Sequence, residues 1–172
     1  MGKGLLFIGD SLVEFFDWAA RFPKHTVYNM GIAGETVDGL YRRLERTVGN
    51  LNDVDMVFIM SGINNLAMDD KGFIRTYRKI IREMTGRFPS VRIFVHSLLP
   101  VLYPFISNDD VRSINLQLRT LAGDEGVFYL DIHSHFLDDG DNPDPSCLSE
   151  DGVHLSNKGY MVWSGEIEKL LG

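Results

Sequence analysis

A serine, an aspartate and a histidine stand where apolar runs of the sequence give way to turns. Ser11 follows the run of residues 5–9, and Asp151 and His154 share the motif DGVH far along the chain. A serine hydroxyl attacks a carbonyl at neutral pH when a base takes its proton, and histidine has the pKa for that task. A carboxylate on the far ring nitrogen would orient the imidazole. We interpret Ser11 as nucleophile, His154 as base and Asp151 as its orienting group.

Three groups could stabilise the anion that develops on the carbonyl oxygen. They are the backbone N–H groups of Ser11 and Gly34 and the side-chain amide of Asn64, each of which follows a separate apolar run. Removing one such donor from an enzyme costs about 2.7–4 kcal/mol of transition-state stabilisation. Glycine at position 34 also lets the backbone approach a ligand closely or adopt a positive φ. We predict that these donors form an oxyanion hole.

Each of these residues also has a simpler interpretation. Serine readily caps a helix, and a tight turn alone would explain Gly31 and Gly34. Taken alone, Asp151 and His154 are typical of an acid at a helix start and a histidine on the surface. The chemical interpretation therefore requires a fold that brings residues from both ends of the chain together.

Five runs rich in Val, Ile, Leu and Phe are continuous rather than alternating, which predicts strands buried on both faces. They are residues 5–9, 26–29, 54–60, 91–97 and 127–131. Segments with helical periodicity lie between them, most clearly residues 70–84 with Gly86 as a stop, and a last helix follows Asn157. This alternation predicts one doubly wound, three-layer α/β/α domain over residues 1–172. In such a sheet, sites form beyond the carboxyl ends of the strands, where the candidate residues lie.

Four short blocks resemble those of a known family. GDSL at residues 9–12, the turn at Gly34, GIN at residues 62–64 and DGVH at residues 151–154 have the order and spacing of the SGNH, or GDSL-type, hydrolases. The resemblance extends from residue 5 to about residue 163, and it is to the branch that resembles platelet-activating-factor acetylhydrolase. One position departs from the pattern, because Asn65 stands where the third block usually has an aspartate.

The resemblance implies the rest of the architecture and the chemistry. It implies a flavodoxin-like, five-stranded parallel sheet of order 2-1-3-4-5. It also implies Ser11, Asp151 and His154 as a catalytic triad, Gly34 and Asn64 in the oxyanion hole, and ester or thioester hydrolysis without a metal or other cofactor. Because the missing aspartate is expected to be a supporting group, Asn65 affects the geometry around the site rather than the mechanism.

Composition limits the choice of partners. The 172 residues carry a formal charge of −7, whereas binding to nucleic acid or to an anionic membrane needs a basic face. Basic pairs such as Arg42 and Arg43 are expected on helix surfaces among acids. No apolar run approaches the roughly 20 residues that span a bilayer, so stable membrane insertion is not expected. A single cysteine, Cys147, fits a cytoplasmic protein, and a homo-oligomer is compatible with the sequence.

Several other residues invite a chemical interpretation. His133, His135 and nearby acids suggest a metal site, although they lack a second ligand pair at a standard spacing. His96 is expected to be a hydrogen-bonded core or edge residue. Tyr103 and Phe105 follow the fourth predicted strand, and we expect them to form a wall for the acyl or leaving group.

The sequence thus predicts a serine esterase for carboxylic esters of small or short acyl groups, with a small-molecule ester as its substrate. Three alternatives remain. The first is a thioesterase or lysophospholipase for longer acyl chains. The second is a non-catalytic module that binds a carbohydrate or lipid in the same cleft, and the third is metal-dependent hydrolysis near His133.

Overall fold

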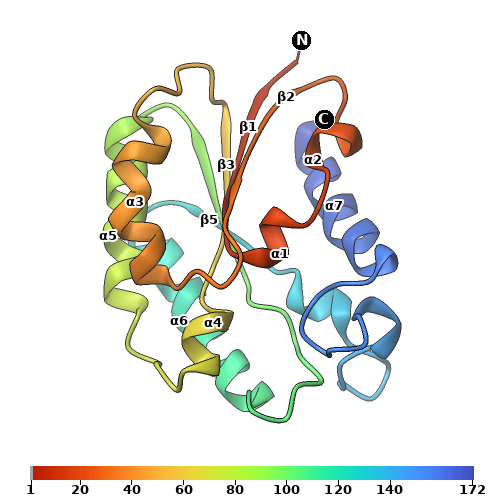
Figure 1. Cartoon of the computed structure of the whole chain (residues 1–172). Coiled ribbons are helices and arrows are strands. Elements are labelled where there is room, and N and C mark those ends of the chain that lie inside the picture. Colours follow the sequence, from red (N-terminus) through yellow and green to blue (C-terminus); the bar gives the residue numbers. More distant parts are fainter. Residues whose placement is uncertain (1) are drawn as a thin grey trace.

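A computed structural model describes residues 2–172 of the chain. Five parallel strands form one sheet in the order β2-β1-β3-β4-β5, which confirms the expected topology (Figure 1). The strands are β1 Gly4–Gly9, β2 Thr26–Gly31, β3 Met56–Met60, β4 Arg92–His96 and β5 Phe128–Leu130. The α-helices are α1 Ser11–Glu14, α2 Trp18–Arg21, α3 Val37–Val48, α4 Ile63–Ala67, α5 Ile74–Arg87, α6 Asn108–Asp124 and α7 Asn157–Leu171. Two 3-10 helices, His133–Phe136 and Pro145–Cys147, lie between β5 and α7.

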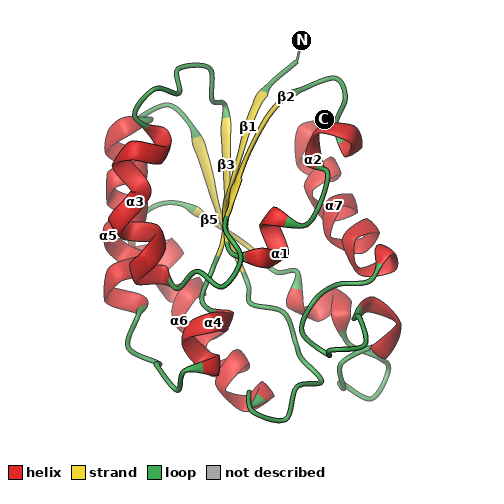
Figure 2. Ribbon diagram, viewed as in Figure 1, coloured by secondary structure: helices red, strands yellow, loops and turns green. Residues whose placement is uncertain are grey.

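Helices cover both faces of the sheet. Helices α3, α5 and α6 lie on one face, and α1, α2 and α7 lie on the other (Figures 1 and 2). Successive side chains of a strand point to opposite faces, so β1 serves two cores. Leu6 and Ile8 belong to the core beneath α3 and α5, whereas Leu5 and Phe7 belong to the core beneath α7. This is why the central strands have continuous apolar runs.

The two edge strands are less buried than predicted. Every residue of β1 and β3 is buried, but β2 and β5 consist of half-buried and exposed residues. An edge strand has a neighbour in the sheet on one side only, so its other side is open to solvent. The prediction of full burial for these two strands was therefore wrong, although their positions in the chain were correct.

The helix predicted over residues 70–84 is displaced toward the C-terminus. Helix α5 begins at Ile74 because Asp70 instead accepts the Gly72 N–H in a turn (2.9 Å). The helix also continues through Gly86, the predicted stop, and ends at Arg87, after which the Phe88 N–H donates to the Met84 carbonyl. An interior glycine costs a helix about 1 kcal/mol, and the buried side chains of Met84 and Phe88 stabilise the last turn.

Within residues 2–172, no helix is both long enough and apolar enough to cross a bilayer.

Candidate active site

The turn between β1 and α1 presents Ser11 at the carboxyl edge of the sheet. Asp10 caps α1, because its Oδ1 accepts the Leu12 N–H at 3.1 Å. Asp10 therefore has the structural role of organising the turn. Ser11 is the first residue of α1, so its own N–H has no partner within the helix.

The fold brings together the three residues predicted to act on an ester. His154 Nε2 lies 3.0 Å from Ser11 Oγ, although the two residues are 143 positions apart. On the other side of the ring, Nδ1 lies 2.6 Å from Asp151 Oδ2. A carboxylate accepts hydrogen bonds, so Nδ1 carries the proton and Nε2 is free to accept the Ser11 hydroxyl. This is the arrangement needed for a histidine base.

Asp151 sits in a turn that keeps it ionised. Its Oδ1 accepts the N–H groups of Val153 and His154 and the Ser149 hydroxyl, each at 2.9 Å. Partial burial acts to raise the pKa of Asp151, but these hydrogen bonds and the one from the His154 ring outweigh it. The pKa of Asp151 therefore lies well below its usual range, and the carboxylate is available to the imidazole at neutral pH.

The surroundings of the imidazole are open and partly apolar. The His154 side chain is 34% exposed, and the Phe15 ring lies against it with centroids 5.3 Å apart. The loop after β4 reaches the same turn, because the Leu102 N–H donates to the Gly152 carbonyl at 2.8 Å. Farther along this loop, Tyr103 packs edge-on against Phe105. The residues predicted to form an acyl wall are thus on a loop that contacts the Asp151–His154 turn.

The three predicted oxyanion donors are free to bind a ligand. Among residues 2–172, the N–H groups of Ser11 and Gly34 have no hydrogen-bond acceptor. Gly34 has a φ of +74°, and a Cβ added there would meet nothing within 4 Å. The Asn64 side-chain nitrogen donates to the Glu35 carbonyl at 3.0 Å. An amide nitrogen carries two hydrogens, so one remains.

Asn65, the departure from the family pattern, belongs to the supporting structure. Its buried side chain accepts the Val37 N–H at 2.9 Å and donates to Asp70 Oδ2 at 2.6 Å. It therefore joins the start of α3 to the turn before α5. An ionised aspartate at this position could accept from Val37 but would repel the Asp70 carboxylate, so asparagine suits the neighbour that this chain has.

Three further histidines, His96, His133 and His135, differ in their surroundings. His96 is buried, and its Nδ1 accepts the Trp163 indole N–H at 3.0 Å, which confirms the core interpretation. Burial lowers the pKa of His96 to about 3, so the ring is neutral. His133 is also buried, whereas His135 is exposed and lies 3.7 Å from Glu166. Within residues 2–172, no three His, Cys, Asp or Glu side chains gather into a potential metal site.

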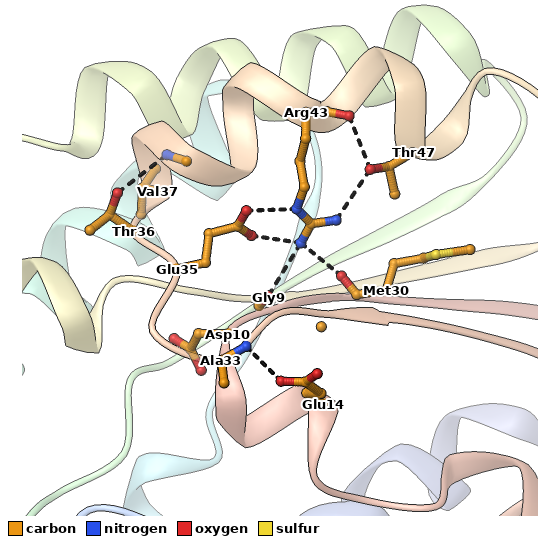
Figure 3. A network of polar contacts seen from close by, with 12 residues as sticks. Gly9, Asp10, Glu14, Met30, Ala33, Glu35, Thr36, Val37, Arg43 and Thr47 are labelled. Atoms are coloured by element: carbon orange, nitrogen blue, oxygen red, sulfur yellow. Dashed lines mark hydrogen bonds and ion pairs between the residues drawn. The ribbon is translucent and has the colours of Figure 1, made fainter.

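Sequence reasoning missed an ion pair beside the Gly34 turn. Arg43, expected on a helix surface, is only 8% exposed and binds the Glu35 carboxylate (Figure 3). The expectation of a solvated Arg43 was therefore wrong. One signal was available, because position 43 follows the buried Leu40 by three residues and so borders the apolar stripe of α3.

These features describe an α/β protein with a serine–histidine–aspartate arrangement at the carboxyl edge of a parallel sheet. The profile of the GDSL-like Lipase/Acylhydrolase family matches residues 7–162, and the chain belongs to this family. The resemblance to SGNH hydrolases is therefore confirmed, and the protein is a carboxylic ester hydrolase. No curated protein sequence matches the chain.

Solved structures support the same fold. A protein from Streptococcus pneumonia, described provisionally as a platelet activating factor, is 25% identical with a TM-score of 0.90, covering 100% of this chain and 85% of its own. A catalytic mutant of an acetylxylan esterase from Geobacillus stearothermophilus is 21% identical with a TM-score of 0.81, covering 100% and 96%. A GDSL-like lipase from Bacteroides thetaiotaomicron is 18% identical with a TM-score of 0.79, covering 98% and 87%. The last two likenesses concern the fold alone.

Proposed function

We propose that the protein is a serine esterase that cleaves small-molecule esters of short acyl groups through an acyl-enzyme on Ser11. The observation that carries this proposal is the continuous contact from Ser11 Oγ to His154 Nε2 at 3.0 Å and from His154 Nδ1 to Asp151 at 2.6 Å. A serine that only capped a helix would need neither contact.

The proposed reaction has two steps. Ser11 Oγ attacks the acyl carbonyl while its proton passes to His154 Nε2, and the carbonyl π electrons move to the oxygen. When the tetrahedral intermediate collapses, the ester C–O bond breaks and the leaving alcohol takes the proton from His154. Water then attacks the acyl-enzyme with the same histidine as base, which releases the acid and restores the Ser11 hydroxyl. Asp151 stabilises the imidazolium ion in both steps.

The free donors of Ser11, Gly34 and Asn64 would stabilise the oxyanion in both steps. Two of them are backbone N–H groups that need no reorganisation, because the turns that carry them are already formed. If any one donor is removed from such a site, kcat falls by about 10²–10³-fold. The expectation that Gly34 and Asn64 serve as donors thus becomes part of the proposal.

Preference for a short acyl group follows from how open the site is. The side chains of Asp151 and His154 are 52% and 34% exposed, so a long acyl chain would keep much of its surface in water. Exposed apolar side chains beside the imidazole and on the loop after β4 favour a second candidate, a thioesterase or lysophospholipase. Phe15, Leu102 and Phe105 are 57%, 50% and 76% exposed, and they could cover part of a longer chain. Tyr103 and Phe105 remain the proposed wall.

Hydrolysis of 4-nitrophenyl acetate tests the proposal. Ser11→Ala should abolish turnover while the circular dichroism spectrum is unchanged, and Ser113→Ala, which alters an exposed serine of α6, should behave as wild type. Undiminished turnover by Ser11→Ala would refute the mechanism. Wild-type protein that hydrolyses neither this ester nor the panel below would support the non-catalytic binding module.

The substrate class needs a separate panel. Acyl length is varied from acetyl upward in 4-nitrophenyl esters, and acetylated xylan, phospholipids and acyl thioesters vary the leaving group. Acetylated xylan is included because a structural neighbour is an acetylxylan esterase. The short-acyl proposal predicts that kcat/KM declines with chain length, whereas a rise toward long chains favours the second candidate.

A further inference from the structure

The loop of residues 32–36, which joins β2 to α3 and carries Gly34, is held on both sides of that glycine. On one side, the Ile32 N–H donates to the Gly9 carbonyl at 3.0 Å. Next to it, the Ala33 N–H donates to the Glu14 carboxylate at 2.6 Å (Figure 3). The loop is thereby attached to β1 and to α1, the helix that begins with Ser11. The Gly34 N–H, between these contacts and those of Glu35, is left without an acceptor among residues 2–172.

On the other side of Gly34, a bidentate ion pair holds Glu35. Arg43 Nε lies 2.7 Å from one oxygen of the Glu35 carboxylate, and a terminal guanidinium nitrogen lies 2.6 Å from the other. The side chains of Arg43 and Glu35 are only 9% and 10% exposed. Two parallel hydrogen bonds fix the direction of a carboxylate as well as its position.

The guanidinium also binds the ends of two strands and a hydroxyl of its own helix. The terminal nitrogen that contacts Glu35 also donates to the Met30 carbonyl of β2 at 2.8 Å and lies 3.5 Å from the Gly9 carbonyl of β1. The other terminal nitrogen donates to the Thr47 hydroxyl at 3.2 Å (Figure 3). Arg43 therefore connects the Gly34 loop to the strand ends beside Ser11 through two of its nitrogens, and the third binds within α3.

Glu35 also touches a second oxyanion donor through its backbone. Its carbonyl accepts one hydrogen of the Asn64 side-chain amide at 3.0 Å. This contact sets the rotation of the amide and therefore the direction of its other hydrogen. A single residue is thus adjacent to one proposed donor, Gly34, and hydrogen-bonded to another, Asn64.

We propose that Arg43 and Glu35 are positioning residues that align the Gly34 and Asn64 donors with the substrate oxyanion. This inference rests on the proposed function, because it assumes that those donors bind an oxyanion. Stability alone explains the pair poorly, since a buried ion pair can often be replaced by apolar residues without loss. An apolar pair would lack the guanidinium contacts with the Met30 and Gly9 carbonyls, so the Gly34 loop would be held at the strand ends by the Ile32 N–H alone.

Three variants of the pair and one matched control test this inference. Glu35→Gln removes the carboxylate charge, the double variant Glu35→Gln with Arg43→Met removes both charges, and Arg43→Lys keeps a charge but loses the bidentate geometry. The control is Glu125→Gln. The Glu125 side chain is also 10% exposed and is bound by two arginines, Arg78 and Arg82. It precedes β5, at the end of the sheet opposite Ser11.

Each folded variant is assayed for kcat and KM on 4-nitrophenyl acetate and for inhibition by a trifluoromethyl ketone. Such a ketone forms a hemiketal with the serine and mimics the tetrahedral oxyanion. Misplacing the donors should lower kcat by about 10- to 100-fold and change KM by less than about twofold. The affinity of the enzyme for the ketone should fall in parallel with kcat. Glu125→Gln should change none of these values, even if it unfolds at lower temperature.

Three results would overturn the inference. They are a kcat equal to that of the control, a loss confined to KM, and a loss of kcat without weaker binding of the ketone. If Glu35→Gln does not fold because Arg43 is left unpaired, the double variant tests the positioning role instead. If the double variant also does not fold, Arg43→Lys is the test. Ser11→Ala separates the two proposals. If it abolishes turnover while the pair variants match the control, only the positioning role is wrong.

Discussion

Replacing Asp151 with asparagine should prevent His154 from acting as a base while leaving the turn intact. The Asp151 carboxylate uses Oδ1 for the Val153 N–H, the His154 N–H and the Ser149 hydroxyl, and it uses Oδ2 for the His154 ring. An asparagine can keep its oxygen at the first position, which satisfies the turn. Its amide nitrogen then faces His154 Nδ1 and donates to it.

This substitution changes the tautomer of the His154 imidazole. When Nδ1 accepts a hydrogen bond, the ring proton must sit on Nε2, the nitrogen that lies 3.0 Å from Ser11 Oγ. A protonated Nε2 cannot accept the serine proton. The corresponding change in a serine protease lowers kcat by about 10⁴-fold, which is about 5 kcal/mol of transition-state stabilisation. We expect a loss of this order for Asp151→Asn.

The assay compares kcat for 4-nitrophenyl acetate at pH 7 with the thermal unfolding midpoint of each variant. Asp144→Asn is the matched control, because Asp144 lies in the same loop and binds Ser146 and Lys158 rather than the imidazole. Asp144→Asn should lower the midpoint without a comparable loss of kcat. A loss of less than about tenfold for a folded Asp151→Asn, or equal losses for both variants, would refute the tautomer argument.

Two further predictions concern stability. Burial is the main cause that raises the pKa of Asp10 to about 7. The folded protein therefore keeps a proton that the unfolded chain releases above about pH 4, and wild type should lose stability relative to Asp10→Asn, by about 3 kcal/mol, as pH rises from 4 to 7. Urea unfolding across this range checks the sign, and a constant difference would contradict it. Gly152 has a φ of +71°, and an added Cβ would lie 2.8 Å from the Leu102 backbone. Gly152→Ala should therefore lower the free energy of unfolding in urea by about 2–4 kcal/mol. An unchanged midpoint would contradict this prediction and show that the Leu102 loop moves to accommodate the added methyl group.

Topology was predictable from the sequence because it depends on the order of a few strong signals. Continuous apolar runs that alternate with helical segments allow few arrangements, and the four blocks resemble one family with a known strand order. The contact between Ser11 and His154 could be expected for the same reason. Both residues follow strands or loops that end at one edge of the sheet, although they are 143 positions apart.

Burial at the sheet edges was not predictable from the runs themselves. The pattern of β2 and β5 resembles that of the inner strands, and only the strand order shows that they lie at the edges. Helix α5 gives a similar lesson. Asp70 and Gly86 carry ordinary start and stop signals, but the turn bonded to Asn65 and the buried Met84 outweigh them.

The ion pair beside Gly34 shows a different limit. A charged side chain is normally exposed, so the sequence predicts Arg43 at the surface as long as its partner is unknown. Glu35 is eight positions away, on a loop whose path depends on β1, β2 and α4 together. Local patterns cannot place two such side chains against each other, which is why the positioning role emerges from the structure.

The central claim is that Ser11 becomes acylated by a mechanism that requires His154. Labelling with a fluorophosphonate, followed by peptide mass spectrometry, tests this claim most directly. We predict a single adduct on Ser11 that is absent from Ser11→Ala and forms far more slowly in His154→Ala. An adduct on another residue, or a native protein that does not react, would contradict the account.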